Sequence, residues 1–156
     1  MSRISKTHAG FTIMELMVVI AIIGILSAVS MPNLISWRLD RHYNESLQQT
    51  FAIVNSTKTN AIKENRNAVV EFHIADREIR AFTLDENENE LDRLHTYELR
   101  HGVDMENLNI AGGGNQLEFN SRGIPVGNQP STIGLKSDRG RSNQIEISMA
   151  GRIRLQ

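Results

Sequence analysis

Phe11 to Ser30 reads FTIMELMVVIAIIGILSAVS, a run of twenty residues whose only ionisable side chain is Glu15. Helical residues rise about 1.5 Å each, so the run spans about 30 Å, the thickness of the hydrocarbon core of a bilayer. A carboxylate inside such a segment costs on the order of 2–3 kcal/mol and normally implies a function. The run therefore predicts a transmembrane helix over residues 11–31 with a functional carboxylate near its start.

The flanks of this run allow two interpretations. Residues 1–10, MSRISKTHAG, form a short basic leader, and Pro32 predicts a bend or local break in the helix. An ordinary secretory signal would share the basic start, and a cut after Ser30 would free a soluble periplasmic protein that begins at Met31. The length of the run, its carboxylate and the helical pattern that continues beyond it favour the anchored helix.

Beyond the apolar run, the chain keeps a helical pattern to about Asn65. Apolar residues recur at spacings of three and four, and polar residues fill the other face. Residues 32–67 are therefore expected to form the periplasmic half of the N-terminal helix, which packs on the globular domain through its apolar face. The apolar positions are Leu39, Tyr43, Leu47, Phe51, Val54 and Ala61/Ile62.

Residues 68–156 change to period two and short runs, which predicts a β-rich globular domain. The fold class is therefore α+β, with a long N-terminal hydrophobic helix packed on a small antiparallel β-sheet domain. A hairpin turn is expected at Ala150-Gly151. The predicted strands are 68–75, 78–84, 103–110, 116–119, 132–136, 144–149 and 152–155.

The N-terminal residues resemble the processing site of type IV prepilins and type II secretion pseudopilins. The family pattern is a Gly, then a Phe, then a Glu five residues into the mature chain, and Gly10, Phe11 and Glu15 fill it. Pro32 also falls where family members have theirs. The resemblance implies a pilin-like fold, cleavage by a prepilin peptidase between Gly10 and Phe11, and methylation of the new Phe11 amine.

The C-terminal residues are similar to the GspH/FimT group of minor pilins and pseudopilins. The stretches that carry the similarity are Phe119-Asn120-Ser121-Arg122-Gly123, Ile145-Glu146-Ile147-Ser148 and Gly151-Arg152-Ile153. The resemblance implies a single-pass protein of the inner membrane, whose globular domain lies in the periplasm or, in a filament, on the cell surface. Its expected partners are other pilin or pseudopilin subunits, the prepilin peptidase and the inner membrane.

Glu15 needs a positive partner if it is buried in a membrane or a filament. In a filament of such subunits, the obvious partner is the Phe11 amine of a neighbouring subunit, with one amine for each carboxylate. We therefore assign Glu15 to filament assembly. The alternative is a Glu15 side chain that snorkels to the membrane interface from its place near the start of the helix.

No pattern in the sequence points to catalysis, a cofactor or a metal. Cysteine is absent, the five histidines lack ligand spacing, and no nucleophile–base, paired-carboxylate or phosphate-loop pattern stands out. The acidic stretch 85–92 begins like a calcium loop but has Glu90 where glycine is required and Thr96 where a bidentate glutamate is required. A solvated hairpin loop is the preferred interpretation, and the protein is not expected to be an enzyme.

Charge is distributed unevenly along the domain. Residues 71–98 hold nine acidic and three basic residues, whereas residues 120–156 hold six basic and two acidic ones. Arginine presents a planar fork that suits phosphate. If the loop at 138–142 lies near the C-terminal strand, Arg139, Arg141, Arg152 and Arg154 would form one patch for double-stranded DNA.

The tail Gly151-Arg152-Ile153-Arg154 matches the G-R-x-R tail of FimT-type minor pilins that bind DNA. This resemblance favours a minor pilin that acts in filament assembly and DNA uptake. Two alternatives stay open: a solvated polar strand in which the glycine simply makes the turn, and a GspH-like pseudopilin that acts in protein secretion without DNA binding. The sequence does not separate the type IV pilus from the type II secretion machine.

Overall fold

The computed structural model describes residues 11–156, without the side chains of Val29, Pro32 and Asn33. The predicted leader, with Gly10 of the cleavage site, therefore lies outside the described residues. The chain divides into two compact units, Met1–Arg38 and Leu39–Gln156. Helix α1, Ile13–Glu64, belongs to both units, and eight strands belong to the second.

Helix α1 keeps its helical conformation through Pro32. No local break interrupts it there, and the bend predicted at Pro32 stays a prediction. The helix ends in the left-handed residue Asn65, whose N–H, like that of Arg66, donates to a carbonyl of the last turn. Positive φ is tolerated by asparagine better than by most residues, which explains the stop at this position.

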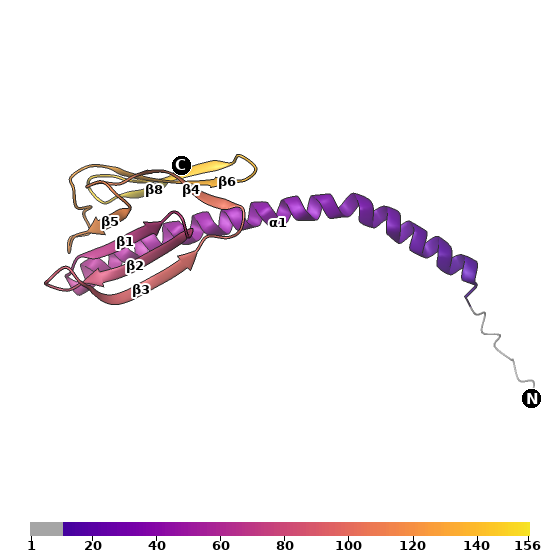
Figure 1. Ribbon diagram of the computed structural model, residues 1–156, viewed down its shortest axis with the longest axis horizontal. Coiled ribbons are helices and arrows are strands. Elements are labelled where there is room, and N and C mark those ends of the chain that lie inside the picture. The colour runs from indigo at the N-terminus through magenta and orange to yellow at the C-terminus, as the bar shows by residue number, and fades with distance from the viewer. Residues whose placement is uncertain (1–10) are drawn as a thin grey trace, which may run out of the picture. The chain divides into compact units, whose positions relative to one another are not determined.

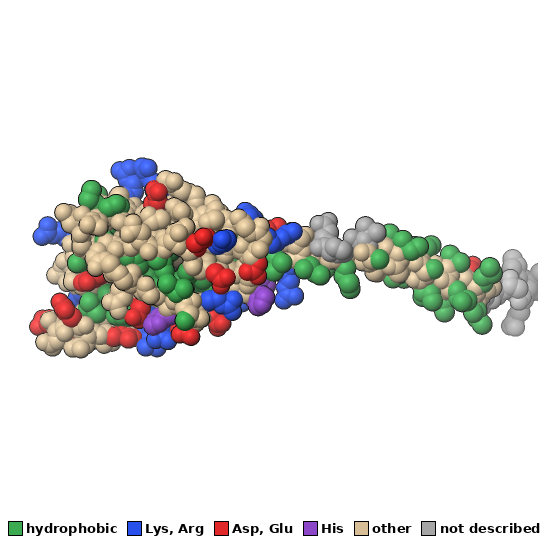
Figure 2. Space-filling model, turned by 45° about the horizontal axis from the view of Figure 1, so that its top comes forward, with side chains coloured by type: hydrophobic (Ala, Val, Ile, Leu, Met, Phe, Trp, Pro, Cys, Tyr) green, Lys and Arg blue, Asp and Glu red, His purple; other side chains and the backbone are tan. Residues whose placement is uncertain are grey.

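The first unit exposes nearly continuous apolar side chains. Large hydrophobic residues between Ile13 and Trp37 are exposed on all sides of the helix, and Figure 2 shows them along the N-terminal part of α1. Among the residues described, no helix is both long enough and apolar enough to cross a membrane. The transmembrane helix predicted over residues 11–31 is therefore not confirmed.

The second unit contains two antiparallel four-stranded sheets, seen as separate layers beside the C-terminal part of α1 in Figure 1. The first has the order β3-β2-β1-β5 and the second the order β4-β6-β7-β8. Their strands are β1 Ala68–His73, β2 Glu78–Leu84, β3 Glu90–Glu98, β4 Val103–Asn109, β5 Gln116–Phe119, β6 Ser131–Ser137, β7 Ser142–Ile147 and β8 Ile153–Leu155. The α+β fold class is confirmed.

One hydrophobic core joins α1 to both sheets. The predicted apolar face of the helix is buried at Tyr43, Leu47 and Val54, and of the alternatives Ala61/Ile62 the first is buried, whereas Ile62 is 48% exposed. The buried threonines of α1 are satisfied within the helix, because the Oγ1 atoms of Thr50 and Thr57 each donate to the carbonyl at i−4 over 2.8 Å. The helix can therefore bury polar side chains at little cost.

Strand β3 was missed, because part of it was assigned to a loop at 85–92. Most of its side chains are exposed, and two irregularities interrupt its pairing with β2. It therefore lacks the alternation of buried and exposed residues that marks a half-buried strand. It contacts α1 through hydrogen bonds such as the 3.0 Å bond between Ser56 Oγ and His95 Nε2, and its Leu94 and Tyr97 side chains pack against the core.

Candidate functional site

The start of α1 is capped by Thr12 and Glu15. Thr12 Oγ1 accepts the backbone N–H of Glu15 over 3.2 Å, and the Glu15 carboxylate accepts the backbone N–H of Thr12 over 3.0 Å and its hydroxyl over 3.1 Å. These reciprocal bonds form a capping box, which satisfies two backbone donors at the helix start. Glu15 is therefore held in place before any neighbour is present.

Thr12 is a site residue that the sequence analysis missed. Its signal was readable, because the order Thr-x-x-Glu before an apolar run is the sequence mark of a capping box. The adjacent Phe11 is 89% exposed. A carboxylate has about four acceptor positions, so Glu15 can hold Thr12 and still accept an amine from another chain.

Arg139 and Arg141 lie in the turn between β6 and β7 and face α1. Their guanidinium groups lie 3.6 and 3.5 Å from the two carboxylate oxygens of Asp40. The guanidinium of Arg141 also lies 5.2 Å from the centre of the Tyr43 ring, within the range of a cation–π interaction. These two arginines are therefore partly neutralised by one carboxylate of α1.

Arg152 and Arg154 line a hollow at the other end of the β6–β7–β8 face. Neither guanidinium group has an ion-pair partner among residues 11–156. The carboxylate of Glu146, directly opposite Arg154 in the sheet, accepts a 2.8 Å hydrogen bond from Gln156 instead. These two charges are therefore available to an external anion.

The structure does not bring the four predicted arginines together. Arg154 lies opposite Glu146 in the register of β7 and β8. Glu146 follows Arg141 by five residues, which corresponds to about 17 Å at 3.4 Å per residue. Arg152 lies beside Ser148, about 24 Å from Arg141 on the same scale. The single patch expected from sequence is wrong, because the two pairs occupy opposite ends of a hairpin.

Gly151 has two structural reasons to be glycine. Its φ of 75° is a left-handed conformation that other residues adopt at a cost. A Cβ atom at this position would also overlap the backbone carbonyl oxygen of Gly123. The Gly151 carbonyl accepts a 2.8 Å hydrogen bond from Lys58 Nζ on α1, so the turn before Arg152 is tied to both the helix and a second turn. The predicted hairpin turn is confirmed.

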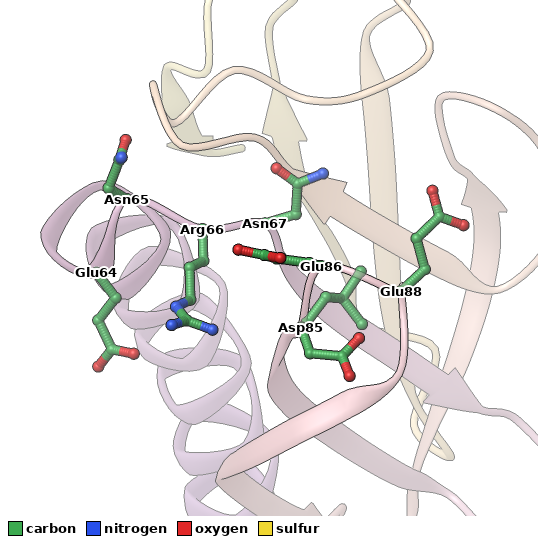
Figure 3. A pocket seen from close by; sticks show the side chains of 8 residues that line it. Glu64, Asn65, Arg66, Asn67, Asp85, Glu86 and Glu88 are labelled. Carbon is green, nitrogen blue, oxygen red and sulfur yellow. The ribbon is translucent and has the colours of Figure 1, made fainter.

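A second hollow lies between the end of α1 and the β2–β3 turn (Figure 3). Four carboxylates and Arg66 are among the side chains that line it. The backbone N–H of Asn89 donates to Asp85 and holds the pKa of this carboxyl below its usual range. Within the described part of the chain, no group of three or more His, Cys, Asp or Glu side chains could hold a metal ion. The lining carboxylates are Glu64, Asp85, Glu86 and Glu88.

Comparison with known proteins identifies the family. The profile of the family described as type II transport protein GspH matches residues 46–151, more than half of the chain. The chain belongs to this family. The profile of the prokaryotic N-terminal methylation motif matches residues 5–31, so the GspH-family domain follows a prepilin-type N-terminus. The chain is thus a structural subunit of the minor pilin or pseudopilin type, as expected, and not an enzyme.

Solved structures share the fold of this GspH-family chain. The type IV minor pilin FimU of Pseudomonas aeruginosa has a TM-score of 0.62 at 14% identity, covering 75% of this chain and 90% of that one. The minor pseudopilin EpsH from the type II secretion system of Vibrio cholerae has a TM-score of 0.60 at 15% identity, covering 74% and 96%. These two neighbours come from different machines, so the fold alone does not choose between them.

One curated relative is the type IV major pilin protein PilA of Myxococcus xanthus. It is 38% identical over 58 residues, which make up 37% of this chain and 26% of PilA. The match therefore spans about a quarter of that protein.

Proposed function

We propose that this GspH-family subunit is a FimT-like minor pilin, held in the inner membrane by a single pass over residues 11–31 until it enters a filament. The observation that carries the proposal is the apolar helix that starts at Ile13, two residues after Phe11, and is capped by Thr12. Exposing a large apolar surface to water is unfavourable, so we expect the exposed hydrophobic side chains of this helix to be buried by lipid or by the helices of neighbouring subunits. A filament of such helices buries them.

Processing prepares this helix for assembly. In the proposal, prepilin peptidase cuts between Gly10 and Phe11 and methylates the new amine. The Phe11 amine of one subunit then meets the Glu15 carboxylate of another, where each buried charge requires its partner. The capping bonds of Thr12 keep Glu15 in position for this contact.

Glu15→Gln tests this step. It keeps the side chain's size but removes the charge, so the variant should stay in the membrane fraction and be lost from sheared filaments. Glu45→Gln is the matched control, because Glu45 is a half-buried residue of the same helix that pairs with Arg100 within the chain. Equal incorporation of the two variants into filaments would reject the role of Glu15.

A second proposed activity is binding of double-stranded DNA through Arg152 and Arg154. The supporting observation is that these side chains line one hollow and form no ion pair among residues 11–156, since the Glu146 carboxylate of the same hollow accepts a hydrogen bond from Gln156. Contacts of arginine with phosphate would be independent of sequence and would weaken as salt rises. No aromatic side chain lines this hollow, so base stacking is not part of the proposal.

The test is a titration of the full chain in detergent micelles with a random-sequence duplex at two salt concentrations. The Arg152→Ala/Arg154→Ala variant should lose salt-dependent binding, whereas the control Arg139→Ala/Arg141→Ala should keep it, because those arginines face Asp40. Binding that survives in the first variant would reject the DNA site. A GspH-like role in protein secretion would then be favoured, and deletion of the gene should affect secretion rather than DNA uptake.

A further inference from the structure

The contact between Gly123 and Gly151 places the backbone of a third arginine near that of Arg152. The backbones of these two glycines touch, since a Cβ on Gly151 would overlap the carbonyl oxygen of Gly123. Arg122 and Arg152 are the chain neighbours of these glycines. With 3.8 Å between consecutive Cα atoms, their own Cα atoms lie within roughly 12 Å of each other.

Both arginines sit in turns fixed by the same kind of hydrogen bond. The backbone N–H of Arg122 donates to Asn120 Oδ1 over 2.9 Å, and that of Arg152 donates to Ser148 Oγ over 3.0 Å. Lys58 then joins the second turn to α1 through the Gly151 carbonyl. The two backbones are therefore held before a ligand arrives, which reduces the entropy lost on binding.

The guanidinium groups of these arginines form no ion pair within the described part of the chain. Arg122 is exposed, and its guanidinium group, like those of Arg152 and Arg154, has no ion-pair partner among residues 11–156. Glu146 is the nearby carboxylate of the same hollow. Duplex DNA carries one negative charge for about every 1.7 Å of its axis. A surface on which the Cα atoms of Arg122 and Arg152 lie within roughly 12 Å of each other therefore faces several phosphates at once.

We infer that Arg122 is a phosphate-contacting residue that completes a three-arginine surface with Arg152 and Arg154. The inference rests on the proposed DNA binding and adds a residue to it. Each phosphate neutralised changes the slope of log K against log salt by about −0.9, so three contacts predict a slope of roughly −2.7. Glu146 opposes the same ligand, so its removal should strengthen binding.

The test measures this slope for the full chain in nonionic detergent micelles, with a random-sequence duplex between about 50 and 200 mM salt. Arg122→Ala should make the slope shallower by about 0.9, and Arg122→Lys should restore it, since both ammonium and guanidinium groups neutralise a phosphate. Glu146→Gln should raise the affinity. Arg139→Ala is the control and should leave the slope unchanged.

The outcomes separate the inference from the proposal on which it depends. Arg122→Ala with a wild-type slope, combined with loss of binding in Arg152→Ala/Arg154→Ala, would overturn the role of Arg122 alone. A loss of affinity in Arg122→Ala that Arg122→Lys does not restore would also overturn it, because the side chain would then act through packing. Absence of salt-dependent binding in the unaltered protein would overturn both.

Discussion

Gly151→Ala is expected to destabilise the second unit by an amount that can be worked out from two separate causes. The left-handed conformation, with φ at 75°, costs a residue with a Cβ about 1–2 kcal/mol. The new methyl group would also overlap the Gly123 carbonyl oxygen, and forcing an extra carbon into a packed site typically costs about 1–3 kcal/mol more. The expected total is about 2–5 kcal/mol.

Gly140→Ala is a matched control in the β6–β7 turn of the same sheet, the turn that precedes the one with Gly151. Its φ of 82° gives a similar conformational cost, but no heavy atom lies within 4 Å of the position a Cβ would take. This substitution should therefore cost only the conformational part, about 1–2 kcal/mol. The difference between the two variants isolates the contact of Gly151 with Gly123.

Thermal unfolding followed by circular dichroism provides the assay. For a unit of this size, 1 kcal/mol lowers Tm by about 4 °C. Gly140→Ala should thus lower Tm by about 4–8 °C, and Gly151→Ala by about 8–20 °C. Equal shifts would refute the reasoning, because they would mean that the glycine before Arg152 only makes a turn and does not pack against the second turn.

Three further substitutions test other parts of the structure. Tyr43→Phe removes a buried hydroxyl that donates to the Leu135 carbonyl or to Asn143, so the free energy of unfolding should fall by about 1 kcal/mol, and no change in chemical denaturation would contradict this. Gln116→Leu removes the main donor that lowers the pKa of Glu71. In an NMR titration, the Glu71 carboxyl of the variant should therefore titrate at a higher pH. The lowered pKa stabilises the fold at pH values above the unfolded pKa, and in the variant this stability should already be lost at a higher pH as the pH falls. An unchanged titration of Glu71 would speak against Gln116 as the cause. Thr12→Ala removes the helix cap at a cost of about 1 kcal/mol, so amides of the first turn should exchange faster with solvent than in the unaltered chain.

The sequence predicted the elements that follow simple patterns. The apolar spacing from Leu39 gave a helix that buries Tyr43 and Val54, and alternation over 78–84 gave β2 with its observed bounds. In both cases one face is buried and the other exposed, so hydrophobic periodicity carries the information. Strand β3 could not be found this way, because most of its side chains are exposed and no alternation of buried and exposed residues marks it.

The arrangement of the arginines depends on contacts between distant segments. The sequence predicted one patch for all four arginines, but only Arg152 and Arg154, two residues apart on an extended segment, line one hollow. It could not show that Asp40 lies beside Arg139 and Arg141, 99 and 101 positions further along the chain. It also gave no sign that Gly123 meets Gly151, the contact that places Arg122 near Arg152.

The central claim is that the chain is processed as a prepilin and kept in the membrane as a filament subunit. The most direct test is mass analysis of the N-terminus of the protein recovered from the membrane fraction of its own host. The account predicts a mature chain that begins with N-methylated Phe11. A chain that begins at Met31 in the soluble periplasmic fraction, or one that keeps Met1, would contradict it.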